Sequence, residues 1–321
     1  MLILTMKDDK IKDFESRFPD KKTAISLIND LQSLDLRKFT LEDLDDIIDD
    51  VFHMIPFGKS YIEKGTDLFR ARKSSDKQVF HNISELGINK PENITSFGRA
   101  HEPHNPVLYC SSNLKLACGE VLQNLKHSFN PKKEVALTTV SIWETTKKLH
   151  LAPVYYSKGV TDVREDAKKY KEGNMKYIRE KNIINSSTLE VQDLIMEFFC
   201  EEFSKIEIKY PDDYKLSVSY ANRLKNANDL IAPEYSSERF DGLIYPSVAM
   251  KYSGDNVVLF DNNLESKLKF KTAFKVICVD FDFDKADFKS YFMHEIESVD
   301  ELGNIIWSDK VWEAPVEKNN T

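Results

Sequence analysis

The chain has few of the residues that build disulfide scaffolds, flexible linkers or membrane spans. Among 321 residues there are 10 glycines, 11 prolines and 4 cysteines. The cysteines form no C-x-x-C pair, which argues against a zinc cluster or disulfide framework and predicts buried free thiols. No apolar run approaches the roughly 20 residues of a membrane helix, and the N-terminus lacks a secretory signal pattern. We therefore expect a cytoplasmic protein with no membrane partner.

An excess of basic residues is also missing. The formal net charge is −8 and the sequence pI is about 5.5, so the surface as a whole does not suit a phosphate backbone and nucleic acid is not an expected partner. Apolar residues make up 41% of the chain and aromatic residues 11%, enough for a buried core and too much for a disordered chain. A local basic pocket for a small anion stays open.

Periodicity predicts an α+β fold with a mostly antiparallel sheet. Helical spacing dominates residues 20–60, where Thr40 and Asp43 form the pattern of a capping box, and returns in residues 155–235, where Ser187 and Glu190 suggest a second box. Strand-like runs lie between and after these segments, without alternating βαβ units. We expect an N-terminal helical unit over residues 1–60 and a second domain over 61–321, interrupted by a helical insertion at about 155–235.

Common catalytic motifs are absent from the sequence. It contains no G-x-G-x-x-G after a strand, no P-loop, no H-E-x-x-H and no G-x-S-x-G. The nearest approach to a metal site is the run "HEPH", with His101, Glu102 and His104. Nothing near this run completes a ligand set, so we expect no bound metal.

Several polar residues at strands and loops are candidates for binding an anion. Arg70 and Arg72 alternate with apolar residues in "LFRARK", so in a strand both guanidinium groups share one face, where a pyrophosphate would suit them. An edge strand with both arginines solvated explains the spacing equally well. Arg99 follows Gly98 in a loop before a strand, which suits binding or a surface ion pair.

Three further candidates have structural explanations beside their functional ones. Tyr109 ends the apolar run "PVLY" and suits a core position with its hydroxyl at the rim. Glu120 lies on the flank of the apolar stripe in "LKLACGEVLQNLK", where glutamates usually mark the solvent boundary. Ser247 closes "DGLIYPS" and suits a strand-end hydroxyl bonded to the backbone, with no Ser-His-Asp arrangement to make it a nucleophile.

Taken in order, three blocks of the sequence resemble the RES domain. They are "LFRAR", "FGRAHEPHNPVLYCSSNLKLACGEV" and "FDGLIYPSVAMKYSGDNVVLF", and they span about residues 66–260. The family is named for an arginine, a glutamate and a serine, which by position fall on Arg70, Glu120 and Ser247. The arginine of its Gly-Arg pair falls on Arg99 and its strand tyrosine on Tyr109, while Arg72 is a secondary candidate.

The resemblance implies a bacterial NAD-degrading toxin or defence effector with an ADP-ribosyltransferase-like fold. In that reading Glu120, Arg70 and Ser247 are catalytic, and Arg70, Arg72, Arg99, Tyr109 and Ser247 bind the dinucleotide. NAD is the substrate, no cofactor is required, and the acceptor is water or inorganic phosphate, which makes the enzyme a glycohydrolase or a phosphorylase. A mono-ADP-ribosyltransferase acting on a macromolecule and an inactive nucleotide-binding or partner-binding protein remain as alternatives.

Two features depart from the family pattern. Family members commonly have Asn and Gly after the Gly-Arg pair, where this chain has His101 and His104. Glycine in that loop suits a positive-φ turn, so the sequence leaves the conformation of the loop open. The two helical additions exceed the compact toxin form and suit a lid, a homodimer interface or a surface for an antitoxin.

Overall fold

A computed structural model describes residues 12, 15–51, 59–74, 79–123, 135–155, 157–158, 164–180, 184–229, 239–260 and 264–308. By internal contacts the chain divides into two compact units. The described residues of the first fall within 1–61, 91–106 and 150–246, and those of the second within 62–90, 107–149 and 247–321. The predicted domain boundary near residue 60 and the bounds of the predicted insertion stay predictions.

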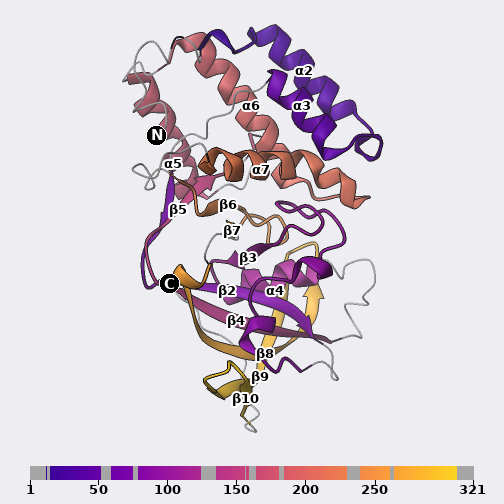
Figure 1. Ribbon diagram of the computed structural model, residues 1–321, viewed down its shortest axis with the longest axis vertical. Helices are drawn as coiled ribbons and strands as arrows, with labels where there is room; N and C mark the ends of the chain where they lie inside the picture. The colour runs from indigo at the N-terminus through magenta and orange to yellow at the C-terminus, as the bar shows by residue number, and fades with distance from the viewer. Residues whose placement is uncertain are drawn as a thin grey trace. The chain divides into compact units, whose positions relative to one another are not determined.

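The first unit is built mainly from helices. They are α2 (Lys21–Ser33), α3 (Leu41–Val51), α5 (Glu165–Glu180), α6 (Ser186–Ser204) and α7 (Lys215–Asp229), with short turns η2 (Leu36–Lys38), η4 (Pro91–Asn93) and η5 (Pro211–Tyr214). Helix α2 packs against α6, α3 packs against α7, and α6 packs against α7 (Figure 1). Strand β1 (Ser60–Ile62) lies beside β5 (Leu149–Pro153), which pairs in parallel with β6 (Gly242–Pro246).

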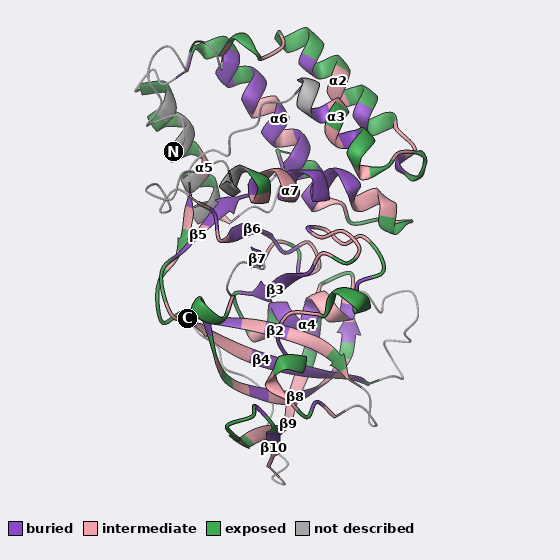
Figure 2. Cartoon of the chain, in the orientation of Figure 1, coloured by how far each residue is buried: buried purple, intermediate pink, exposed green. Residues whose placement is uncertain are grey.

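Aromatic side chains fill the core of this helical unit. Helices α6 and α7 turn largely buried faces inward (Figure 2). Ring contacts within 6 Å join Phe199 and Phe203 of α6 to Tyr220 of α7. Burial of these large rings is the main favourable term for a helix pair of this kind, since each buries about 150–250 Å².

Helix starts follow local capping chemistry. Thr40 and Asp43 form the predicted capping box, because the amide of Asp43 donates to Thr40 Oγ1 and the amide of Thr40 donates to Asp43 Oδ2. The second predicted box is wrong. Helix α6 begins at Ser186, and Asn185 is its N-cap, accepting from the amide of Thr188 at 2.8 Å. The predicted extension of α3 into residues 52–55 lies outside the described residues.

The second unit holds a seven-stranded antiparallel part of the sheet. Its strands are β2 (Asp67–Ser74), β3 (Val107–Ser111), β4 (Ala136–Thr145), β7 (Asp255–Phe260), β8 (Leu268–Asp282), β9 (Asp287–Val299) and β10 (Ile305–Trp307). They lie in the order β7-β3-β2-β4-β8-β9-β10, with short turns η3 (Ile83–Glu85) and η7 (Leu264–Ser266) beside them. The predicted α+β class with a mostly antiparallel sheet is confirmed. Strands β9 and β10 form a C-terminal hairpin.

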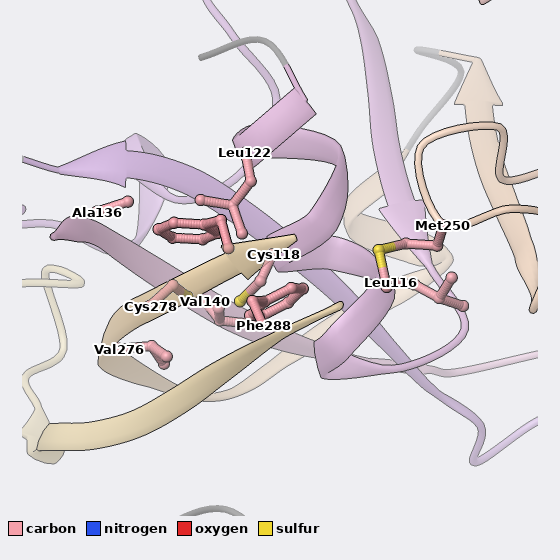
Figure 3. Close-up of a cluster of buried hydrophobic side chains, with 10 residues drawn as sticks. Leu116, Cys118, Leu122, Ala136, Val140, Met250, Val276, Cys278 and Phe288 are labelled. Carbon is pink, nitrogen blue, oxygen red and sulfur yellow. The ribbon is translucent and has the colours of Figure 1, made fainter. Parts of the chain in front are cut away.

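Helix α4 (Leu114–Gln123) covers one face of this sheet. Its apolar side chains pack into a cluster with side chains of β4, β8 and β9, and Cys118 points toward Cys278 (Figure 3). Phe69 and Ala71 of β2 pack against the same cluster. Because neighbouring side chains of a strand point to opposite faces, Arg70 and Arg72 lie on the face away from α4.

The cysteines agree with a further expectation from composition. All four cysteines are free and buried. Burial raises the pKa of the Cys110 thiol to about 12 and that of Cys200 to about 12. In the part of the chain that the structure describes, no helix combines the length and the apolar character needed to cross a membrane.

Candidate functional site

Helix α4 carries Glu120 on the border of its buried side. Asn113 starts the helix, since its Oδ1 accepts from the amide of Leu116 at 2.9 Å. Leu116, Cys118 and Leu122 then point into the core. Glu120 is half-buried on the flank of this apolar stripe, so its carboxylate lies at the edge of the core.

Two side-chain donors converge on one oxygen of Glu120. Ser247 Oγ donates to Glu120 Oε1 at 2.6 Å, and Asn256 Nδ2 donates to the same atom at 2.6 Å. Both donors are almost completely buried, with Ser247 at 0% exposure and Asn256 at 3%. Hydrogen bonds to a carboxylate favour its ionised form and are stronger than bonds between neutral groups. Oε2 accepts no hydrogen bond from any residue that the structure describes.

A compact turn over residues 247–254 delivers Ser247 to this position. The amide of Ser247 donates to Gly254 O at 2.9 Å, and its carbonyl accepts from the amide of Tyr252 at 2.8 Å. Lys251 and Tyr252 both have positive φ, at 48° and 63°, a region that residues other than glycine rarely adopt. The turn is therefore folded tightly by its own backbone bonds at some conformational cost.

The same turn packs directly on α4. Met250 reaches over Gly119, where a Cβ would lie 2.1 Å from the Met250 sulfur. Glycine in a helix interior costs about 1 kcal/mol relative to alanine, and here it makes room for Met250 beside the residue that carries the carboxylate. The turn and the helix thus fix each other next to Glu120.

Tyr109 lies on the same sheet face as the donors of Glu120. Ser111 pairs with Asn256 and Tyr109 pairs with Val258 across β3 and β7, and residues two apart on a strand share a face. Tyr109 is half-buried. The structure therefore brings Tyr109, Ser247 and Glu120 to one side of the sheet.

Arg70 and Arg72 lie on the opposite face. Arg70 pairs with Ser141 of β4, and its Nη1 donates to the carbonyl of Tyr109 at 3.2 Å. Arg72 Nη2 donates to the carbonyl of Gly87 at 2.9 Å. The Nε atoms of both arginines are buried and have no hydrogen-bond partner among the described residues.

Burial makes the charge on these arginines costly. Desolvation, with the positive charge of Arg72 adding to it, lowers the pKa of Arg70 to about 10. Burial also lowers the pKa of Arg72. Neither guanidinium forms an ion pair with a carboxylate of the described residues. An anion bound beside the two guanidinium groups would offset the cost of burying their charges.

Arg99 belongs to the first unit and holds the end of a helix there. Its Nη1 donates to the carbonyl of Phe203 at 2.5 Å and its Nη2 donates to that of Lys205 at 3.0 Å, at the C-terminus of α6. Its guanidinium also lies 5.3 Å from the ring centre of Tyr214. A cation is favourable at this end of a helix, where carbonyls have no intrahelical partner.

The "HEPH" loop adopts the turn that glycine would suit. His104 has φ of 63°, and its amide donates to the carbonyl of Ile94 at 2.9 Å. Glu102 Oε1 accepts from Asn105 at 3.0 Å and from Asn222 at 3.3 Å. No three His, Cys, Asp or Glu side chains of the described residues gather to hold a metal ion.

Comparison with known protein families matches residues 67–277 to the RES domain, over more than half of the 321 residues. The chain belongs to the RES domain family. A search of curated proteins found no match.

The RES match extends from the start of β2 into β8, and so includes α4, the Ser247 turn and the described helices α5 to α7. Asn256 and Ser111 are the site residues of this RES domain that sequence reasoning missed. Asn256 stands in "SGDN", a string typical of a turn, and Ser111 ends a strand. Only the position of Asn256 at the start of an apolar strand, beside the serine block, distinguishes it from an ordinary turn residue.

Proposed function

We propose that this RES domain degrades NAD by breaking the bond between nicotinamide and ribose. The observation that carries the proposal is the Glu120 carboxylate, held on one oxygen by Ser247 and Asn256, inside the region matched to the family. The wider family resemblance, which implies NAD degradation, supports the choice of substrate.

The chemistry places specific demands on this carboxylate. When the C1′–N bond breaks, nicotinamide leaves with the bonding electron pair and the ribose becomes oxocarbenium-like, with positive charge spread over C1′ and the ring oxygen. An ionised carboxylate beside the ribose stabilises that charge. Glu120 suits this part because two donors hold its Oε1 and Oε2 accepts no bond from the described residues. An oxygen of water or inorganic phosphate then bonds to C1′, and a proton passes to solvent when water is the acceptor.

In this proposal Ser247 sets the direction of the carboxylate and contacts the ribose. Tyr109, on the same sheet face, packs beside the nicotinamide. Arg70 and Arg72 bind the pyrophosphate, and their unpartnered Nε atoms support an anionic ligand. The assignment of both arginines to the pyrophosphate rests on the resemblance and on these Nε atoms, because they lie on the other face of the sheet from Glu120. Contact between Arg99 and the dinucleotide stays a prediction.

The biological setting follows from the resemblance and is proposed on that ground. A toxin or defence effector that depletes NAD requires control, and a small antitoxin protein is the partner that we propose. The helical first unit offers a surface for that protein or for a second copy of the chain. A gene for a small helix-turn-helix protein beside this one would support the antitoxin.

Release of free nicotinamide tests the activity. Purified protein is incubated with NAD, with and without inorganic phosphate, and nicotinamide and the ribosyl product are followed by chromatography. We expect release that Glu120→Gln abolishes while the melting temperature stays within a few degrees. Glu144→Gln, at a half-exposed glutamate on β4, is the matched control and keeps full activity. No release from folded wild-type protein under either condition contradicts the proposal.

Labelled NAD identifies the acceptor. Label that stays in small molecules indicates hydrolysis or, when the product is ADP-ribose phosphate, phosphorolysis. Label that appears on protein or nucleic acid indicates ADP-ribosyl transfer by the same site. Binding of NAD without nicotinamide release would indicate an inactive nucleotide-binding protein.

A further inference from the structure

Asn256 is the second donor to Glu120 and is held in place by a third polar side chain. Ser111 Oγ donates to Asn256 Oδ1 at 2.8 Å, and Asn256 Nδ2 donates to Glu120 Oε1 at 2.6 Å. Ser111 and Asn256 are directly opposed in the pairing of β3 and β7. The three side chains thus form one directed line of hydrogen bonds from β3 through β7 to α4.

The direction of this line determines which end of the amide faces the carboxylate. The amide of Asn256 has one accepting and one donating end. Because Ser111 donates to the accepting end, the donating end turns to Glu120. The reversed amide would place Oδ1 against an ionised carboxylate, which is repulsive. Ser111 and Asn256 are 2% and 3% exposed, so water does not readily replace either partner.

Among the described residues, only Ser247 and Asn256 donate hydrogen bonds to the Glu120 carboxylate, although other charged and titratable groups lie around α4. The elements packed against the helix carry Tyr109 on β3, Lys251, Tyr252 and Asp255 near the Ser247 turn, Cys118 and Cys278 in the core, and the Lys115–Asp287 ion pair. Among the described residues, no ion pair or hydrogen bond joins any of these groups to Glu120. Its carboxylate is thus stabilised in the fold by two neutral donors.

We propose that Asn256, oriented by Ser111, is the positioning residue that fixes the rotation of the Glu120 carboxylate and turns its Oε2 toward the substrate. The inference rests on the proposed function for its catalytic part. Ser247 alone leaves the carboxylate free to rotate about its last side-chain bond, whereas two donors on one oxygen fix that rotation.

Asn256→Asp tests the inference with almost no change in shape. At neutral pH the introduced carboxylate faces that of Glu120, and two like charges at hydrogen-bond distance favour uptake of a proton. When the proton lies on the introduced aspartate, its side chain donates to Glu120 as asparagine does. The variant is therefore expected to recover activity as the pH falls, and wild type is expected to show no such recovery.

The experiment measures nicotinamide release from pH 5 to 8.5 for wild type, Asn256→Asp, Ser111→Ala and Asn113→Asp. We expect Asn256→Asp to lose about 10–100-fold in kcat at neutral pH, with KM for NAD changed far less, and to recover at low pH. Ser111→Ala frees the amide to reverse and loses a smaller factor, roughly 3–10-fold, with the wild-type form of the pH profile. Asn113→Asp adds the same charge at the N-cap of α4, where a negative charge is favourable, and keeps wild-type activity.

Two results overturn the inference. One is a wild-type pH profile for Asn256→Asp. The other is a loss by the same factor at every pH together with a fall in melting temperature, which indicates a structural role only. If Asn256→Asp does not fold, nicotinamide release by Ser111→Ala is the test. Wild-type activity in Ser111→Ala then overturns the inference.

A spectroscopic comparison separates failure of this inference from failure of the proposed function. With side-chain ¹³C-labelled glutamate, the Glu120 resonance is assigned by its loss in Glu120→Gln, and its position at neutral pH is compared in wild type, Asn256→Asp and Ser111→Ala. A displaced resonance in both variants supports the positioning role even if no nicotinamide is released. An unchanged resonance overturns the role whether or not the protein is active.

Discussion

Ser247 Oγ donates a hydrogen bond of 2.6 Å to Glu120 Oε1 across 127 positions of the chain. The serine follows a strand and the glutamate belongs to a helix, and the turn from residue 247 to 254 is what brings them together. The two residues share a hydrogen-bond network with Asn256 and Ser111 rather than a nucleophile–base arrangement, because no histidine of the described residues bonds to either of them. The serine is therefore a donor to the carboxylate.

Ser247→Ala should lower nicotinamide release without unfolding the protein. It removes one of two charge-assisted bonds, each of about 1.5–3 kcal/mol, which corresponds to roughly 10–150-fold in rate. Steady-state kinetics and thermal unfolding measure the two effects. Ser253→Ala, at an exposed serine in the same turn, is the control and should match wild type. Full activity of Ser247→Ala would exclude the serine from the site.

Gly119→Ala should reduce activity even though alanine is the better helix former. The gain in helix propensity is about 1 kcal/mol, but the new Cβ would lie 2.1 Å from the Met250 sulfur and must displace that side chain, which belongs to the turn that holds Ser247. Adding Met250→Ala removes the clash, and the double variant should regain part of the lost activity. A double-mutant cycle of kcat measures this coupling. Independent, additive effects would show that Met250 does not transmit the change.

Arg70→Met should keep or raise the melting temperature while impairing use of NAD. The buried guanidinium has a lowered pKa of about 10 and an unpartnered Nε. Its positive charge therefore lowers the free energy of unfolding at every pH below about 10. This loss of stability disappears only as the pH rises from about 10 to 12.5, the pKa in the unfolded chain. Replacing a buried charge with an apolar side chain of similar length is often neutral or stabilising. Thermal unfolding and KM for NAD are measured together. A lower melting temperature with an unchanged KM would assign Arg70 to the fold alone.

His101→Gln should make stability less sensitive to acid. Burial lowers the pKa of His101 in the folded state, opposed by a hydrogen bond with the backbone of Ser96. The unfolded chain therefore binds a proton at a higher pH than the folded chain, and stability falls as the pH drops below about 6.5. Melting temperatures of wild type and variant at pH 8 and pH 5 give the difference. Between pH 8 and pH 5 the melting temperature of the variant should fall less than that of wild type. An equal fall in both proteins would contradict the lowered pKa of His101.

Sequence periodicity was sufficient for the strands and helices because each carries its own pattern. The strand at "TDLFRARK", the helix over "LKLACGEVLQ" and the capping box of Thr40 and Asp43 are all present. The wrong box at Ser187 shows the limit of such patterns: Asn185, two residues earlier, is as good a cap, and the choice depends on where the chain enters the helix.

Relations between distant segments were beyond the reach of the sequence. The alternation of side chains along a strand places Arg70 and Arg72 on one face of the sheet. Whether α4 covers that face or the other depends on strand register, in which Phe69 lies opposite Ser111. Asn256 was missed for the same reason, since its partner lies 136 positions away. Arg99 has its observed carbonyl contacts in residues 104 and 106 positions later.

The hydrogen bonds of Glu120 form late in synthesis, because a ribosome makes the chain from its N-terminus. The glutamate is made early, while Ser247 and Asn256 come 127 and 136 residues later. A chain interrupted before residue 247 contains the carboxylate and neither of its donors. A site built in this way is complete only after most of the protein has been synthesised and β3 and β7 have paired in register, so unfinished chains carry an incomplete site.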